Sequence, residues 1–281
     1  MKKTDKRSKK EKTQTELTPE EAAKKKKRRK IIAVIDIVII VICAAVIGIS
    51  VYKISSVYVE YHVSKNETNA AKAAAFTTGD DYDFDFDALL EQNSEAVGWI
   101  RMKGDAVENG DVDINIDYPV VQTTDNSKYL DVSINGTWNA LGTLFVDYRC
   151  ADGLDSSHAL IWGHNMVHPD DAMFGYINKY QDEEDFYEKY PYYDVWVGGT
   201  HYIYKVFACG PVDVGGFFFT YSFSDEYSLM DWIEDVYENL QIFDTDISEF
   251  DEDSKIISMV ACLTPLEEDR RFAVLMYRLE V

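Results

Sequence analysis

The C-terminal stretch of the chain, residues 256–279, reads IISMVACLTPLEEDRRFAVLMYRL. Its two ends, 256–262 and 272–279, are rich in aliphatic, β-branched and aromatic residues, which predicts two strands. A polar loop with one proline and three acids separates them. Cys262 is the last residue of the first strand, where a thiol can be partly exposed while its backbone is held rigid. The stretch therefore predicts two late strands with a candidate nucleophile at the end of the first.

Similar runs occur through the preceding part of the chain. Further strands are expected at 99–102, 114–121, 144–146, 159–162 and 202–209. Helical spacing of Phe86, Leu89 and Leu90 marks the start of the globular domain. Two other helices are expected at 173–180 and 224–240, the second with Ser224 as a possible N-cap. Many strands with few helices predict a closed β-barrel or a β-sandwich.

Charge is distributed unevenly along the 281 residues, which carry a net charge of −22. Residues 1–30 hold 14 basic and five acidic residues, a net of +9, and the remainder has a net of −31. Between them, residues 31–52 are apolar with Asp36 as the sole charge, a length that can span a bilayer. The basic cluster at 24–30 then predicts a cytoplasmic N-terminus.

This charge pattern predicts a single-pass protein of the cell membrane. Residues 1–30 form the cytoplasmic tail, 31–52 an uncleaved transmembrane signal anchor, 53–81 an extracellular stalk, and 82–281 an extracellular domain. A domain of such acidity is excluded as a nucleic-acid binder, because phosphate contacts need a basic face. Three cysteines outside the anchor do not make a disulfide scaffold, although one pair could bridge.

A second polar cluster follows the expected strand 159–162. Gly163 is followed by His164 and Asn165, and Arg270 and Arg271 open the last strand. Each of these residues alone is more often structural. Together, Cys262, His164 and one arginine would supply a nucleophile, a general acid/base and an oxyanion donor.

Several co-linear motifs make the chain from about Tyr82 onward resemble the sortase family of cysteine transpeptidases, most closely class B. The motifs are NSEAVGWI (93–100), IDYPVVQ (116–122), GTLFVDYR (142–149), WGHNM (162–166), MFG (173–175) and the final Cys-to-Arg hairpin. The resemblance implies a mainly β fold, a closed eight-stranded barrel with a few helices. The segment 224–240 resembles the helix that class B members insert between two late strands.

The resemblance also implies roles for individual residues. Cys262 would be the nucleophile, His164 the acid/base group and Arg271 the oxyanion donor, with Arg270 as the alternative. The substrate-binding residues would be Asn126, Leu130, Trp162 and Val260. Two departures from the family pattern are Ala261, where a threonine usually precedes the cysteine, and Trp162, where tyrosine is common.

The implied reaction is transpeptidation without a metal or cofactor. The enzyme would cleave a C-terminal sorting signal of secreted proteins through a thioacyl intermediate and transfer them to an amine of a lipid-linked peptidoglycan precursor. Two alternatives stay open within the chemistry: a pilus-type sortase that uses a protein lysine, and a cysteine peptidase that uses water. A non-catalytic domain that binds wall or other ligands is disfavoured by the joint occurrence of Cys262, His164 and Arg271.

Overall fold

The computed structural model describes residues 18–77, 83–103, 116–165, 172–262 and 269–280. The chain divides into two compact units, Met1–Ser56 and Val57–Val281. In the first unit, the described residues from Pro19 onward belong to helix α1 (Pro19–Ala75). This helix is long and apolar enough to cross a membrane, which suggests a membrane anchor or a signal segment.

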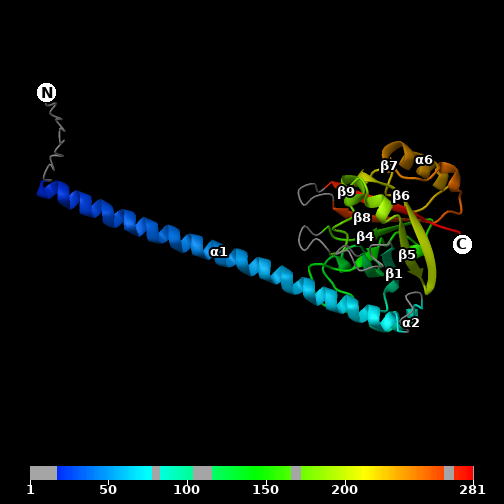
Figure 1. Cartoon of the computed structure of the whole chain (residues 1–281), viewed down its shortest axis with the longest axis horizontal. Helices are drawn as coiled ribbons and strands as arrows, with labels where there is room; N and C mark the ends of the chain where they lie inside the picture. The colour runs from blue at the N-terminus through cyan, green and yellow to red at the C-terminus, as the bar shows by residue number, and fades with distance from the viewer. Residues whose placement is uncertain (1–17, 78–82, 104–115, 166–171, 263–268, 281) are drawn as a thin grey trace, which may run out of the picture. The chain divides into compact units, whose positions relative to one another are not determined.

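The second unit is built on one sheet that closes on itself (Figure 1). The hydrogen-bonded order is β5-β1-β2-β3-β4-β8-β9-β6, and β6 pairs back with β5. The short strand β7 is added to β6. The strands are β1 (Ala96–Lys103), β2 (Asp117–Gln122), β3 (Leu144–Val146), β4 (His158–Trp162), β5 (Tyr192–Val197), β6 (Thr200–Asp213), β7 (Gln241–Ile242), β8 (Ile256–Cys262) and β9 (Arg270–Arg278). The predicted closed eight-stranded barrel is confirmed.

Strand direction brings three chain segments to one end of the barrel. β4 and β8 are parallel, with Trp162 opposite Val260, so their C-terminal ends lie side by side. β9 returns antiparallel to β8 and begins at that same end. The sequence of β8, apolar except for Ser258, fits this central position, because its described side chains, from Ile256 to Ala261, are all buried. Polar residues at the ends of these three strands can therefore lie close together at this end of the barrel.

The sequence did not predict β5, although β5 pairs with both β1 and β6 and closes the ring. Asp194 interrupts its apolar run, and aspartate is depleted in strands. In the fold this carboxylate is buried, 2.8 Å from Nε2 of His201 and 3.8 Å from Nζ of Lys103. The strand expected at 114–121 begins at Asp117, and residues 104–115 lie outside the described part of the chain.

The inserted helix is present as α6 (Leu229–Asn239) between β6 and β8, but it starts later than predicted. Ser228 is its N-cap, because the Ser228 hydroxyl accepts from the Asp231 N–H and the Asp231 carboxylate accepts from the Ser228 N–H. Ser224 instead pairs with Tyr227 in an isolated bridge. The buried face of α6 is made by Leu229, Trp232, Ile233 and Val236, at helical spacing.

The helix expected at 173–180 is wrong for most of its length. Met173 has φ of +52° and pairs with Asn165 in an isolated bridge, a backbone conformation that cannot continue a right-handed helix. Turns follow, and α4 covers only Lys179–Asp182. The other short helical elements are α2 (Phe86–Gln92), η1 (Lys128–Leu130), η2 (Gly153–Asp155), α5 (Phe186–Lys189) and η3 (Ile247–Glu249).

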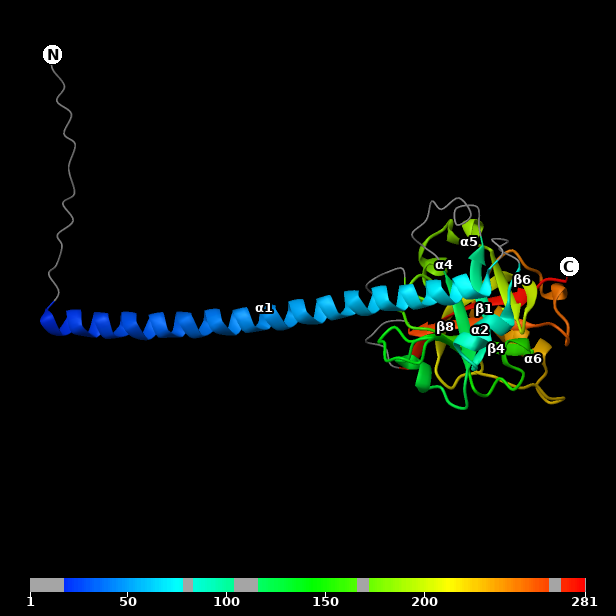
Figure 2. The same cartoon turned by 90° about the horizontal axis from the view of Figure 1, so that it is seen from below.

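Helix α1 runs through most of the stretch 53–81 that is expected to form a stalk, and residues 78–81 lie outside the described part of the chain. From Val57 onward α1 belongs to the same compact unit as the barrel, and its last turns lie beside α2 and β1 (Figure 2). Ala71 and Ala75 are fully buried there, because small side chains let the helix approach closely. Asp117 of β2 joins these elements, since its carboxylate accepts from Lys72 at 2.5 Å and from Trp99 Nε1 at 2.6 Å.

A buried histidine joins the barrel to the segment around α6. His158 of β4 is fully buried, its Nδ1 lies 2.8 Å from the Thr220 carbonyl oxygen, and its Nε2 lies 2.8 Å from Ser258 Oγ. Because the carbonyl only accepts, Nδ1 carries the proton in the neutral ring. The imidazole ring also packs against the ring of Trp232 in α6, with the two ring centroids 4.2 Å apart. Burial lowers the pKa of His158 from its ordinary 6.5 to about 4.

This histidine predicts a pH-dependent stability. Between pH 6.5 and 4 the unfolded chain binds a proton at residue 158 that the folded chain rejects, so stability falls as pH is lowered through this window. Between pH 7.5 and 4.5 the expected loss is about 2–3 kcal/mol, since one pKa unit corresponds to ~1.4 kcal/mol. Denaturant unfolding of the full chain in detergent should show this loss, and His158→Gln should remove it. The matched control is His62→Gln at an exposed position, and an equal effect there would contradict the assignment.

Candidate active site

A pocket of about 240 Å³ lies at the barrel end where β4, β8 and β9 meet. Most of its wall is apolar, and its nitrogen-bearing side chains are those of Asn126, Trp162, His164 and Arg271. The lining residues are Asn126, Tyr129, Leu130, Thr143, Phe145, Trp162, Gly163, His164, Ala261 and Arg271. Five residues singled out from the sequence, Asn126, Leu130, Trp162, His164 and Arg271, are therefore brought together in one cavity.

The hairpin of β8 and β9 distinguishes the two candidate arginines. Cys262, the last residue of β8, is directly opposite Arg271 in the antiparallel ladder. Arg271 is half-buried and lines the pocket, and its Nη1 donates to the Arg270 carbonyl oxygen at 2.9 Å. Arg270 is exposed, and its Nε lies 3.4 Å from Asp213 Oδ1 on β6. The side chain of Cys262 and residues 263–268 lie outside the described part of the chain.

His164 reaches the pocket directly after Gly163, a position where packing requires a glycine. A Cβ on Gly163 would lie 2.5 Å from side-chain atoms of both Leu144 and Phe174, so the chain leaves β4 through a gap that fits no larger residue. Nε2 of His164 lies 2.7 Å from the Leu130 carbonyl oxygen. That oxygen accepts only, so Nε2 carries the proton of the neutral ring and the lone pair is on Nδ1. The imidazole is thereby held in one orientation at the pocket wall.

Comparison with known proteins gives a consistent family. The chain is 26% identical over 182 residues to sortase B of Listeria monocytogenes, a match that covers 65% of this chain and 68% of that protein. A second match, 28% identical over 105 residues, covers 37% of this chain and 38% of sortase B of Staphylococcus aureus. The chain is a homologue of the class B sortases, and so a cysteine transpeptidase.

The fold of this sortase homologue agrees with solved structures. The crystal structure of sortase B from B. anthracis in complex with AAEK1 superimposes with a TM-score of 0.64 at 23% identity, over 80% of this chain and all of that one. No protein-family model matches the chain. At this identity the likeness concerns the fold.

Two other cysteines of the sortase homologue are buried and unpaired. Burial raises the pKa of Cys150 to about 11 and that of Cys209 to about 12, so neither carries much thiolate at neutral pH. The disulfide that the sequence left open is not formed between these two cysteines. Of the cysteines outside α1, the two whose side chains are described are therefore unsuited to nucleophilic chemistry.

Val260, the remaining substrate-binding candidate, does not line the pocket. Its side chain is fully buried in the core, and its carbonyl oxygen accepts from the Gly163 N–H at 3.1 Å. Its neighbour Ala261 lines the pocket instead. Val260 thus contributes to the site through its backbone, which holds the turn before His164.

One functional candidate was missed by the sequence analysis. Asp147, directly after β3, has a fully buried carboxylate that accepts from Asn126 and Trp162, both of which line the pocket. Burial raises the pKa of Asp147, but hydrogen bonds from Arg149, Trp162 and Asn126 outweigh it and hold the pKa below its ordinary value. Asp147 belongs to the motif GTLFVDYR, so the signal was present, but an aspartate before a polar turn reads as exposed.

Proposed function

We propose that this transpeptidase cleaves a C-terminal sorting signal of secreted proteins and joins them to an amine of a peptidoglycan precursor. The observation that carries the proposal is the arrangement at one barrel end, where Cys262 is opposite Arg271 and His164 lines the same pocket as Arg271. The apolar helix α1, with the basic residues at its N-terminal side, supports a position of the domain at the outer face of the membrane.

The proposed chemistry assigns one role to each residue. The Cys262 thiolate attacks the carbonyl carbon of a threonine in the sorting signal, and Arg271 donates hydrogen bonds to the resulting oxyanion. The C–N bond then breaks, and His164 gives a proton to the leaving amine. In the second half the acceptor amine attacks the thioester, His164 takes its proton, and the C–S bond breaks. The guanidinium stays charged throughout, so its donors need no titration.

The apolar lining of the pocket supports a peptide substrate that carries little charge. Its wall is largely aromatic and aliphatic, with Leu130, Phe145 and Trp162 among its members. Such a wall suits an extended peptide with small or apolar side chains, and a few polar groups then fix its orientation.

The function is tested by ligation with the full chain in detergent micelles. A panel of threonine-containing sorting-signal peptides is incubated with a peptidoglycan stem peptide, with a lysine-bearing peptide, or with no acceptor, and products are identified by mass. We expect ligation to the stem peptide. Ligation to the lysine peptide alone would indicate the pilus-type alternative, hydrolysis alone would indicate a peptidase, and no cleavage of any peptide would refute the proposal.

A further inference from the structure

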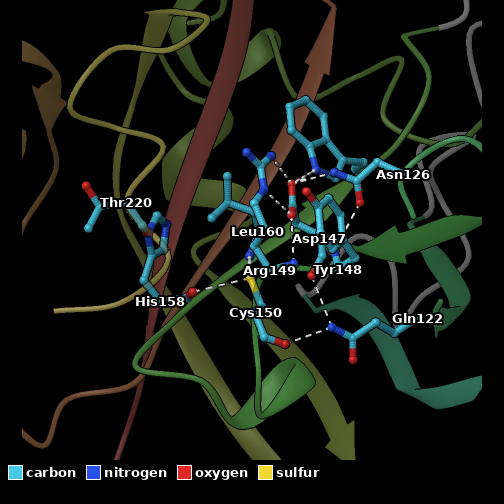
Figure 3. Close-up of polar contacts among 10 residues, drawn as sticks. Gln122, Asn126, Asp147, Tyr148, Arg149, Cys150, His158, Leu160 and Thr220 are labelled. Carbon is cyan, nitrogen blue, oxygen red and sulfur yellow. Dashed lines mark hydrogen bonds and ion pairs between the residues drawn. The ribbon is translucent and has the colours of Figure 1, made fainter. Parts of the chain in front are cut away.

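The carboxylate of Asp147 lies immediately behind the pocket wall and is saturated with donors (Figure 3). Arg149 binds both oxygens, with Nε to Oδ1 and Nη2 to Oδ2 each at 2.8 Å, and the Arg149 N–H also donates to Oδ1 at 3.0 Å. Asn126 Nδ2 and Trp162 Nε1 donate to Oδ2 at 2.7 and 2.9 Å. A carboxylate fixed by a two-pronged arginine is a rigid reference point for its other partners.

This carboxylate decides which way the Asn126 amide faces. Oδ1 of Asn126 accepts from the Tyr148 N–H at 3.0 Å, and Nδ2 donates to Asp147 (Figure 3). The opposite orientation would set an amide oxygen against the carboxylate, so it is excluded electrostatically. An amide NH₂ has two hydrogens, and one of them remains for the pocket. Asn126 therefore presents a donor there.

The same carboxylate fixes the plane of Trp162. The indole N–H points to Asp147, and the ring stacks on Phe219 with centroids 5.7 Å apart and planes 8° from parallel. The orientation of the Trp162 ring is therefore fixed by two contacts, a hydrogen bond at its edge and an apolar contact on its face. Arg149 is held in turn by the ring of Tyr221, whose centroid lies 3.9 Å from the guanidinium carbon.

We propose that Asp147 is a positioning residue for substrate recognition. Asp147 keeps the Asn126 amide oriented as an N–H donor and the Trp162 ring oriented as a flat apolar wall. The pocket then binds an extended peptide that places a carbonyl oxygen next to the Asn126 amide. The inference rests on the proposed function, since it requires that the sorting peptide occupies this pocket. Asp147 does not touch the reacting atoms, so its effect should appear in substrate binding.

The test is Asp147→Asn in the full chain, with kcat and KM measured for the peptide that the wild type ligates best. Asparagine offers one acceptor oxygen in place of two and sets its own NH₂ against the donors of Asn126, Trp162 and Arg149. We expect KM to rise about tenfold to a hundredfold while kcat changes by less than about twofold. The matched control is Asp194→Asn, which removes a buried, paired carboxylate of β5 that lies outside the pocket lining. It should lower thermal stability without changing KM.

Each outcome bears on the proposal. An unchanged KM in Asp147→Asn, or an equal rise in Asp194→Asn, overturns it. Should Asp147→Asn not fold, Arg149→Lys takes its place, because lysine keeps the charge but cannot bind both oxygens in one fork, and KM should rise about threefold or more. An unchanged KM there overturns the proposal too. A wild-type chain that ligates no peptide refutes the proposed function and this inference together, whereas normal ligation with equal KM values refutes only the role of Asp147.

Discussion

Replacement of Cys262 by alanine is expected to abolish the thioacyl adduct between the chain and a sorting-signal peptide. No other group in the proposed site can form a thioester, so the covalent intermediate should disappear entirely, and ligation with it. Intact-protein mass spectrometry after incubation with peptide, without acceptor amine, measures the adduct. Peptide binding should persist, because the described lining of the pocket is made by other residues.

Cys150→Ala and Cys209→Ala are the controls for this experiment. Both thiols are buried and their pKa values are raised to about 11 and 12, so both variants should form the adduct at the wild-type rate once folded. An adduct that survives in Cys262→Ala, or that maps to Cys150 or Cys209, would contradict the nucleophile assignment.

The late strands could be predicted from sequence because local composition and tertiary position agree there. Residues 256–262 are apolar except for Ser258, and β8 is central in the sheet, where a strand is buried on both faces. What the sequence could not provide is the register of β8 against β9. Six residues of loop outside the described part separate Cys262 from Asp269, and a loop of that length permits more than one pairing. The pairing of Cys262 with Arg271 is therefore known only from the structure.

Buried carboxylates account for the main failures of the sequence analysis. Asp194 interrupts the apolar run of β5, so this strand was not predicted, and Asp147 was not recognised as a site residue. In both cases an aspartate in a sequence is expected to be solvent-exposed. Both are nearly or fully buried, and the side chains that contact them, Lys103 and His201 for Asp194 and Arg149 for Asp147, cannot be identified as partners until the fold is known. A buried acid with an adequate partner is a tertiary property.

Val260 failed as a pocket residue for a different reason. The family resemblance implied a substrate-binding role for Val260, but its side chain is fully buried in the core. Val260 is in the core and Ala261 is in the pocket wall. The pocket lies at the end of the barrel, so the residues of β8 that line it depend on how the strand ends there, and the largely apolar sequence of β8 does not indicate this.

The two adjacent arginines should differ sharply in their effect on catalysis. Arg271 is opposite Cys262 in the ladder and lines the pocket, whereas Arg270 pairs with Asp213 on the neighbouring strand. Directly opposed residues of an antiparallel pair share one face of the sheet, and the next residue along points to the other face. We expect Arg271→Ala to lower kcat/KM by about 10²–10³, the usual cost of one lost oxyanion donor. Arg270→Ala should stay within about threefold of wild type, because an exposed ion pair contributes only ~0–1 kcal/mol.

Single-turnover acylation with a sorting-signal peptide separates these variants, because the oxyanion forms in that step. Arg271→Lys adds a sharper comparison: it keeps the positive charge but loses the two-pronged donor geometry, so a rate close to that of Arg271→Ala indicates directed hydrogen bonds, and a rate close to wild type indicates charge alone. Thermal unfolding of all three variants separates catalytic loss from loss of fold. A larger defect in Arg270→Ala than in Arg271→Ala would mean that the reacting carbonyl lies on the other face of β9, and the pocket would then not be the site of acylation.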